Sequence, residues 1–507
     1  MKKGKRNLFV LPAVLVSVSF LLFSGIQIYA AYNHQGDLDS ANFREAYPGQ
    51  ISTKLDSCTL CHSGGSYTSG KKVVTLGSCQ WCHYKTGYGA DSSEENLLAT
   101  LNPYGLAYKN KWQTRGRTAA ALLAIDGDDS DGDGFSNAKE IGAGTYPGDA
   151  ADDPSKIPAP SRVLSLAEFE RMAQHTQFMM MNASKSDDRY TEYRGIDLED
   201  LIRAIMLDSA TGITVYAPDG FATYHPLKPS ANDSSYHVLG IYPKGTFYYD
   251  RQADMATNPA TGWCDYSSPA AAGRVNGEGI TNPDDLKMML AFKRDGEYLT
   301  PGLLNLSNKL DGEGPYRVVP PQKTPGPPDQ RSNAPNPTAE DAWIWPYNED
   351  NSINDHNAGF SSRTVTMIKV EPLPPGTTDI NTLEAGWPYV DEKKVIIYGA
   401  INPRPLYRLY TGLDILINTV KAQGTKSFKN RSSQLALVTH LETIKKQVAR
   451  KAYSAARNNL KQNVANKMDG YLTGKVDAND CVVDLKVQKQ LYNDLQKVWI
   501  ALVILGG

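Results

Sequence analysis

Two five-residue units of one pattern, cysteine, any two residues, cysteine and histidine, start 21 residues apart near the N-terminus. They are Cys58-Thr59-Leu60-Cys61-His62 and Cys79-Gln80-Trp81-Cys82-His83. Two thiols at this spacing can form thioether bonds to the vinyl groups of one porphyrin, and the adjacent histidine can bind its iron. We therefore predict two covalent haem c groups. Their anchors are Cys58, Cys61, Cys79 and Cys82, and their proximal ligands are His62 and His83.

A zinc site is the alternative interpretation of the same cysteines. A C-x2-C pair repeated after a loop is also zinc spacing, and it would use all four thiols. That interpretation leaves the histidine directly after each pair unexplained, so the haem prediction is preferred.

The first 30 residues are typical of a signal peptide. A basic start, Lys2 to Arg6, precedes an apolar run from Leu8 to Phe23 and small residues at Ala30-Ala31. We expect cleavage near Ala30 and export to the periplasm or the cell exterior, with no membrane span in the mature chain. An uncleaved membrane anchor is the alternative, because the apolar run is only slightly short of a spanning helix.

Composition limits the classes of partner. A formal charge of −2 and a pI of about 6.5 argue against a nucleic-acid-binding protein. Four of the six cysteines belong to the two repeated units, which leaves Cys264 and Cys481. In an oxidising compartment these two would either pair or remain as separate buried thiols, and both possibilities stay open.

A chain of 507 residues is too long for one ordinary domain. The Pro-rich run from Asp152 to Ser161 reads as a linker. We predict a multidomain α+β protein: a small, mostly α or irregular dihaem unit, a mixed, mainly β middle domain and a C-terminal α-helical hairpin. The expected ranges are 1–30 for the signal peptide, 31–155 for the dihaem unit, 162–403 for the middle domain and 404–507 for the helical domain.

Hydrophobic periodicity predicts the elements of the later domains. Residues 162–207 have a helical period, whereas Ile213–Tyr216 and Arg363–Val370 read as strands. In the last hundred residues, apolar side chains from Leu437 to Val464 and from Leu485 to Leu502 predict the two helices of the hairpin.

An acidic stretch before residue 141 matches the calcium-loop pattern D-x-D-x-D-G-x5-E. Like charges packed this closely need a hard cation, so we predict a structural Ca²⁺ site. A solvated acidic turn is the alternative. The expected ligands are Asp129, Asp131, Asp133, the carbonyl of Phe135, Asn137 and Glu140.

The haem unit has too few distal ligands for two six-coordinate irons. A low-spin electron-transfer haem needs a second His or Met, and an open position permits ligand binding. After the initiator, this unit contains no methionine and only one spare histidine, His34. The second haem is therefore open or takes its ligand from a later domain or another subunit. The best later candidates are His175 and Met179, which would share a face of a helix; His225, His237 and His356 are further candidates.

The first quarter of the chain resembles exported c-type cytochromes of metal-reducing bacteria. The resemblance rests on the C-x-x-C-H units together with Leu101–Gly105, Asp129–Asn137 and Gly144–Asp149. It implies electron transfer in the cell envelope, with other cytochromes as redox partner proteins and self-assembly as a possibility.

The middle domain resembles the molybdopterin-binding fold of the sulfite oxidase type. That family binds molybdenum through a cysteine ahead of the first matching segment, and this chain has no cysteine between Cys82 and Cys264. We interpret the domain as that fold without its cofactor. The alternative function is a haem-linked oxidoreductase with a substrate, or less plausibly molybdenum, in the middle domain. The matching segments are Gly195–Ile202, Tyr216–Phe221, Lys293–Leu299 and Gly314–Pro320.

Overall fold

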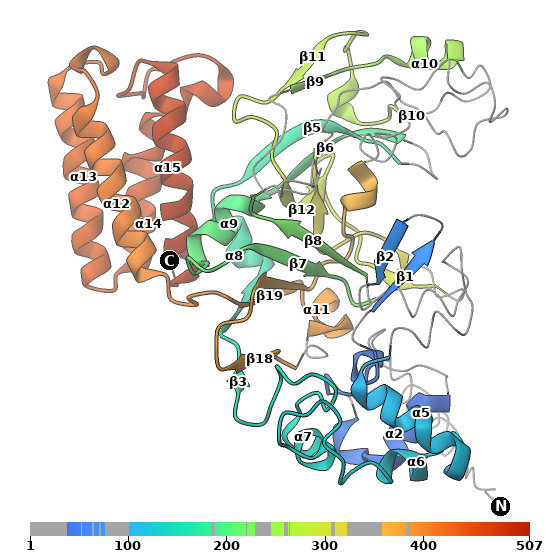
Figure 1. Ribbon diagram of the computed structural model, residues 1–507. Coiled ribbons are helices and arrows are strands. Elements are labelled where there is room, and N and C mark those ends of the chain that lie inside the picture. Colours follow the sequence, from blue (N-terminus) through green and yellow to red (C-terminus); the bar gives the residue numbers. More distant parts are fainter. Residues whose placement is uncertain are drawn as a thin grey trace, which may run out of the picture.

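The computed structural model shows an α+β protein whose chain passes through a small helical unit, a region of β-sheets and a set of long helices (Figure 1). The signal segment, His34 and the second C-x-x-C-H unit lie outside the described residues. These are 38–51, 53–62, 65–69, 72–76, 101–183, 188–219, 221–228, 245–257, 262, 264–305, 310–321, 357–381 and 385–506.

The N-terminal unit packs short helices around an aromatic core. Asn102 caps the N-terminus of the longest of these helices, and Pro103 occupies its first turn, where a missing N–H costs nothing. Phe43, Tyr104 and Tyr108 are buried in this core with several aliphatic side chains. The elements are α2 (Leu38–Ala46), η1 (Pro48–Gln50), η2 (Cys58–Leu60), the hairpin β1 (Gly65–Ser69) and β2 (Lys72–Leu76), α5 (Pro103–Arg115), α6 (Ala119–Leu123) and α7 (Asn137–Ala143).

A five-stranded sheet forms one half of the middle domain, in the order β4-β19-β17-β7-β8. Only β17 and β19 run parallel to each other. The two strands predicted from the sequence are present as β7 and β17. The strands are β4 (Ser161–Ser165), β7 (Gly212–Tyr216), β8 (Ala222–Pro226), β17 (Met367–Glu371) and β19 (Lys394–Gly399).

A six-stranded sheet forms the other half, with β10-β6-β12-β13 as its main path; β5 pairs with β6, and β16 pairs with β12. Its strands are β5 (His175–Met181), β6 (Asp188–Asp197), β10 (Cys264–Asp265), β12 (Met289–Arg294), β13 (Glu297–Tyr298) and β16 (Arg317–Val319). Short pairs add β3 (Ile157–Pro158), β9 (Gly245–Phe247), β11 (Gly279–Thr281), β14 (Leu303–Leu304), β15 (Leu310–Asp311) and β18 (Thr377–Thr378). The helices of this region are α8 (Leu166–Arg171), α9 (Leu198–Ile205), α10 (Arg251–Thr257) and α11 (Trp387–Asp391).

The helical expectation for residues 162–207 is largely wrong. Only α8 and α9 are helical there, and the Met-rich segment is the strand β5. Met179 and Met181 pack into one buried cluster, while Phe178 and Met180 pack into another on the opposite face. A strand buried on both faces reads as a continuous apolar run, which does not distinguish it from a buried helix.

The C-terminal region contains four long helices, so the predicted two-helix hairpin is wrong. α12 contacts α13 and α15, and α14 contacts the same two helices (Figure 1). The stripe expected to form one helix is divided at Lys451, whose φ of 59° is left-handed. Among the described residues, no helix has both the length and the apolar character needed to cross a membrane. The helices are α12 (Leu406–Ala422), α13 (Arg431–Ala449), α14 (Tyr453–Asn463) and α15 (Leu485–Ile504).

One hydrophobic core continues from the five-stranded sheet into the helices. It contains Leu164 and Ile368 of the sheet, Ile202 of α9, and Leu413 and Leu502 of the long helices. Because apolar burial is the main favourable term in folding, this shared core should make the two regions unfold together.

A buried ion pair joins the N-terminal unit to the sheet region. Lys54 Nζ lies 2.9 Å from Asp152 Oδ2 and donates to Thr378 Oγ1 at 2.8 Å. Lys54 and Asp152 are 4% and 5% exposed, and the backbone N–H of Tyr146 also donates to Asp152. Thr378 belongs to β18, which pairs with β3 beside this contact.

We predict that Lys54→Met destabilises the protein by about 3–5 kcal/mol, because it leaves the Asp152 carboxylate buried without its cation. Urea unfolding measures the loss. Lys156→Ala is the matched control, since the Lys156–Asp153 pair (3.3 Å) is partly exposed and should contribute about 1 kcal/mol or less. An equal cost in the two variants would contradict the prediction.

Candidate haem and calcium centre

The first C-x-x-C-H unit lies on a short 3-10 turn, η2, followed by Cys61 and His62. A 3-10 helix has three residues per turn, so positions 58 and 61 lie on the same side of it. Leu60 points into the aromatic core with 1% exposure, whereas Cys61 and His62 are half-buried. The turn therefore fits the attachment of one porphyrin at its accessible side.

Asn102 fixes this turn against α5. Its Nδ2 donates to the carbonyl of Leu60 at 2.9 Å, and its backbone N–H donates to the carbonyl of Cys61 at 2.9 Å. Its Oδ1 accepts from the backbone N–H of Gly105 at 2.8 Å, which is the helix cap. A Cβ at Gly105 would lie 2.3 Å from the Cys61 carbonyl oxygen, so glycine is required there. One residue thus holds both the C-x-x-C-H turn and the start of a helix.

Both ends of the segment that carries the second C-x-x-C-H unit lie at the first unit. His62 forms an antiparallel β-bridge with Leu101, so the chain leaves this place after His62 and returns at Leu101. Cys79, Cys82 and His83 themselves lie outside the described residues.

Two tyrosines and the carboxylate of Asp126 form a hydrogen-bonded group close to this turn. Tyr47 donates to Asp126 at 2.6 Å and lies 3.4 Å from the hydroxyl of Tyr104. Burial, then the nearby Tyr47 and Cys61, raise the pKa of Tyr104 well above its usual value. The phenol therefore stays protonated and adds no charge beside Cys61.

His175 does not fit its predicted role as a distal haem ligand. It is 4% exposed, and its Nε2 lies 2.9 Å from Gln177 Oε1 and 3.1 Å from Asn282 Nδ2. Its Nδ1 lies 3.5 Å from Asp284 Oδ2. Both ring nitrogens therefore have partners inside the middle domain, and Figure 1 shows β5 at the far side of the sheets from α2 and α5.

Met179 is also occupied elsewhere. It is 1% exposed in the core between β5, β6 and β12, and its sulfur accepts from Gln177 Nε2 at 3.1 Å. The two residues do share a face, but it is the face of a strand, where positions i and i+4 also align. His34, the remaining candidate, lies outside the described residues.

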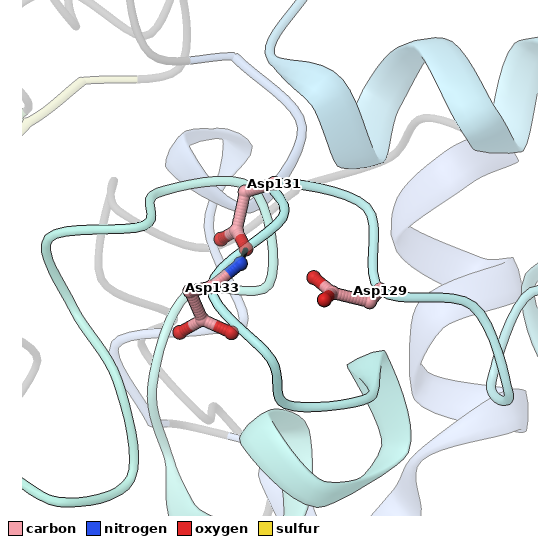
Figure 2. A group of neighbouring side chains, drawn as sticks. All are labelled: Asp129, Asp131 and Asp133. Atoms are coloured by element: carbon pink, nitrogen blue, oxygen red, sulfur yellow. Dashed lines mark hydrogen bonds between the residues drawn. The ribbon is translucent and has the colours of Figure 1, made fainter.

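The predicted calcium loop folds as a compact turn that leads into α7. One carboxylate oxygen from each of Asp129, Asp131 and Asp133 lies within 4.8 Å of the others, and Figure 2 shows the three side chains gathered in this loop. The backbone N–H groups of Gly132 and Gly134 donate to Asp129 at 2.8 and 2.9 Å. Both glycines have positive φ, 82° and 96°, which other residues adopt only at a cost.

Glu140 is the carboxylate of this loop that most needs a cation beside it. It is completely buried, and neither carboxylate oxygen has a hydrogen-bond partner; one oxygen each of Asp131 and Asp133 is in the same situation. Burial, followed by repulsion from Asp131 and Asp133, raises the pKa of Glu140 to about 8. Burial and Asp133 raise the pKa of Asp131 to about 6. A bound Ca²⁺ would remove this penalty, so the donor set fits the ion.

One of the expected ligands, Asn137, has another role in the loop. Its side chain accepts from the backbone N–H of Ser130 at 3.2 Å and donates to the carbonyl of Ile125 at 2.6 Å. It therefore closes the loop rather than facing an ion. For Phe135 the expected ligand atom is the carbonyl oxygen, which stays a prediction; its backbone N–H donates to Asp133 at 2.8 Å, and Lys139 lies 4.1 Å above its ring.

Sequence reasoning did not assign a role to Asn102 or Gly105. An Asn-Pro pair at the start of an amphipathic segment is a signal for a helix cap, and it could have indicated the first residue of α5. The contact of that cap with the Cys61 carbonyl is tertiary and has no local signal.

Cys264 and Cys481 form no disulfide. Cys264 lies in β10 beside Tyr190 and Tyr248, whereas Cys481 packs against the helical core. Of the two possibilities that the sequence leaves open, the structure shows two separate thiols.

Comparisons with known proteins give no relative: no family model, no curated protein and no solved structure matches this chain.

For the calcium loop, we predict that Glu140→Gln abolishes most of the stabilisation by Ca²⁺, because position 12 supplies the bidentate ligand. At Ca²⁺ about 100-fold above Kd, the intact loop should gain about 2.7 kcal/mol. Thermal unfolding in Ca²⁺ and in EGTA measures the difference. Asp128→Asn, an exposed carboxylate just outside the loop, is the control and should respond like the wild type. An unchanged response in Glu140→Gln would contradict the site.

Proposed function

We propose that this chain is an exported dihaem c-type cytochrome that carries electrons in the cell envelope or in an extracellular respiratory chain. The observation that carries the proposal is the first C-x-x-C-H unit. Its turn is pinned by Asn102 and Leu60 on one side, while Cys61 and His62 remain partly accessible on the other.

A rigid attachment site is what an electron carrier requires. Haem supplies reversible exchange between ferric and ferrous iron, and its potential depends on axial ligands and burial. In this chain Cys58 and Cys61 would hold the porphyrin, and His62 would bind the iron. Leu60 and Tyr104 exclude water below the turn. Because the segment bearing the second unit returns to His62 at Leu101, both haems would belong to one unit.

The partners follow from this proposal. Other cytochromes would serve as electron donor and acceptor, and the calcium loop would be a structural site of the same unit. Export rests on the signal-peptide pattern of residues 1–30, and haem attachment in an oxidising compartment agrees with it.

The alternative is a haem-linked oxidoreductase with a substrate, or less plausibly molybdenum, in the middle domain; its molybdenum form has the weaker support. A metal-binding cysteine must be a thiolate. Burial, followed by the carboxylates of Asp188 and Asp254, raises the pKa of the Cys264 thiol well above its usual value. The surroundings of Cys264 thus oppose the form that would bind a metal.

Haem content tests the proposal directly. The exported wild type should contain two haems and two irons per chain by pyridine haemochrome assay and metal analysis. The double variant Cys58→Ala/Cys61→Ala should retain one haem, because one porphyrin loses both thioether anchors. Cys264→Ser is the control and should retain two. A preparation with zinc and no haem would contradict the proposal.

Carbon monoxide tests the axial ligands. If His34 is the distal ligand of one haem, carbon monoxide should change the spectrum of one more ferrous haem in His34→Ala than in the wild type. His440→Ala, a half-buried histidine of α13, should behave like the wild type. Identical carbon monoxide spectra for wild type and His34→Ala would contradict the ligand assignment.

A further inference from the structure

A second acidic loop lies in the helical domain, between α14 and α15. It runs from Asp469 to Asp480, after the short turn η9 (Ala465–Lys467), and contains η10 (Gly470–Thr473). We call it the 469–480 loop. Its three carboxylates, Asp469, Asp477 and Asp480, each offer an oxygen within 4.8 Å of the other two.

Asp480 is completely buried in this loop. Its Oδ2 accepts from the backbone N–H of Asp477 at 2.8 Å, but its Oδ1 is buried with no hydrogen-bond partner. Asp469 Oδ1 is also buried without a partner. A buried carboxylate oxygen without a donor costs free energy comparable to a lost charged hydrogen bond, so two of them at one place indicate a missing positive group.

The spacing of the oxygen donors is that of a 12-residue calcium loop. Asp469 is at position 1, Asp477 at position 9 and Asp480 at position 12. Position 6 is Gly474, whose φ of 72° gives the sharp turn expected there, and position 7 is Lys475, which would contribute its carbonyl. Tyr471 occupies position 3, where a carboxylate is usual.

Gly470 allows the two ends of the loop to approach closely. A Cβ on Gly470 would lie 2.3 Å from Asp480 Oδ2 and 2.5 Å from the carbonyl oxygen of Lys475, so a side chain would clash with both. The glycine thus brings a carboxylate and a carbonyl oxygen together, and both are donor types that a hard cation takes.

We propose that the 469–480 loop is a second calcium site, formed by Asp469, Asp477, Asp480 and the carbonyl of Lys475. Calcium is favoured over magnesium because it accepts several protein oxygens in an irregular shell, whereas magnesium retains water and demands an octahedron. The site has fewer carboxylates than the 129–140 loop, and position 12 is the shorter aspartate instead of glutamate. Its affinity should therefore be lower, with a Kd of about 10⁻⁴–10⁻³ M.

The ion would act on the contact between the helices and the middle domain. Tyr471, inside the loop, donates to Asp284 at 3.2 Å, and its backbone N–H donates to Gln488 of α15 at 2.7 Å. The carbonyl of Lys467 accepts from the N–H of Cys481 at 2.8 Å and closes the base of the loop. Holding this loop in place would hold Tyr471 against the sheet region.

Calorimetric titration of EGTA-treated, full-length holoprotein with Ca²⁺ tests the proposal. The wild type should bind two ions per chain in a tighter and a weaker phase. Asp480→Asn keeps the shape and the acceptor for the Asp477 N–H, and it should remove only the weaker phase. Asp129→Asn should remove only the tighter one. Glu442→Gln, an acid of α13 outside the loop, is the matched control and should retain both.

Asp469→Asn provides a second test at a less buried position, in case Asp480→Asn alters the fold seen by circular dichroism. It should weaken the second phase at least tenfold. The proposal is overturned if the wild type shows only the phase that Asp129→Asn removes. It is equally overturned if a folded Asp480→Asn or Asp469→Asn variant retains the weaker phase. Neither outcome depends on haem content, so this test is independent of the proposed function.

Discussion

The side chain of Asn102 is the contact on which the N-terminal unit depends. It caps α5, holds the carbonyl of Leu60 and, through its backbone, holds the carbonyl of Cys61. A Cβ on Gly148 would lie 2.6 Å from the same side chain, so the segment before the linker also packs against it. Asn102 is 3% exposed, which means that all of these hydrogen bonds are sheltered from water. Such fixed geometry agrees with the proposed attachment of a porphyrin at this turn.

Three buried carboxylates lie beside a protein cation. Asp152 pairs with Lys54, and Glu313 with Arg317. Burial alone would raise the pKa of Asp284, but the hydrogen bond with His175 and the ammonium of Lys287 keep that pKa below its usual range. Each of these carboxylates has a protein cation within reach, which is the condition for burying a charge without a large penalty.

The two acidic loops differ from these three carboxylates. Glu140 and Asp480 are completely buried, and each has a carboxylate oxygen without a hydrogen-bond partner. A carboxylate buried without a cation is costly, and an ion from solution would remove that cost. The two loops therefore have the same physical explanation, although they lie in different domains.

The features that the sequence predicted correctly have a local cause. The strand β7 and the second half of the strand predicted at Arg363–Val370, which is β17, depend on residues close together in the chain. The haem and calcium predictions also rest on local patterns, and they stay predictions. β5 was misread because its apolar run is buried by two different clusters, and this depends on strands far away in sequence. The break between α13 and α14 occurs at Lys451, whose backbone is left-handed. Because this residue is a lysine and not a glycine, the sequence gives no local sign of the break.

The 469–480 loop was missed for a related reason. Its position 3 is Tyr471, so the full acidic pattern is absent, and only the acids at positions 1, 9 and 12 with Gly474 at position 6 remain as a signal. The structure explains the tyrosine: its hydroxyl reaches Asp284, and Gln496 of α15 donates to the same carboxylate at 3.0 Å. That position is used for contact between domains rather than for an ion.

The contacts of Asp284 also explain why His175 is unsuited to bind a haem iron. Asp284 accepts from Tyr471 and Gln496 of the helical domain and from Lys287, and it faces His175 of β5. If His175 left this network, buried polar groups on both sides of the contact would lose their hydrogen-bond partners. Binding to an iron would have to be more favourable than this loss. The histidine that looked like a spare ligand is therefore part of the contact that joins the sheets to the helices. The N-terminal unit, in turn, is held to the sheets by the ion pair of Lys54 and Asp152.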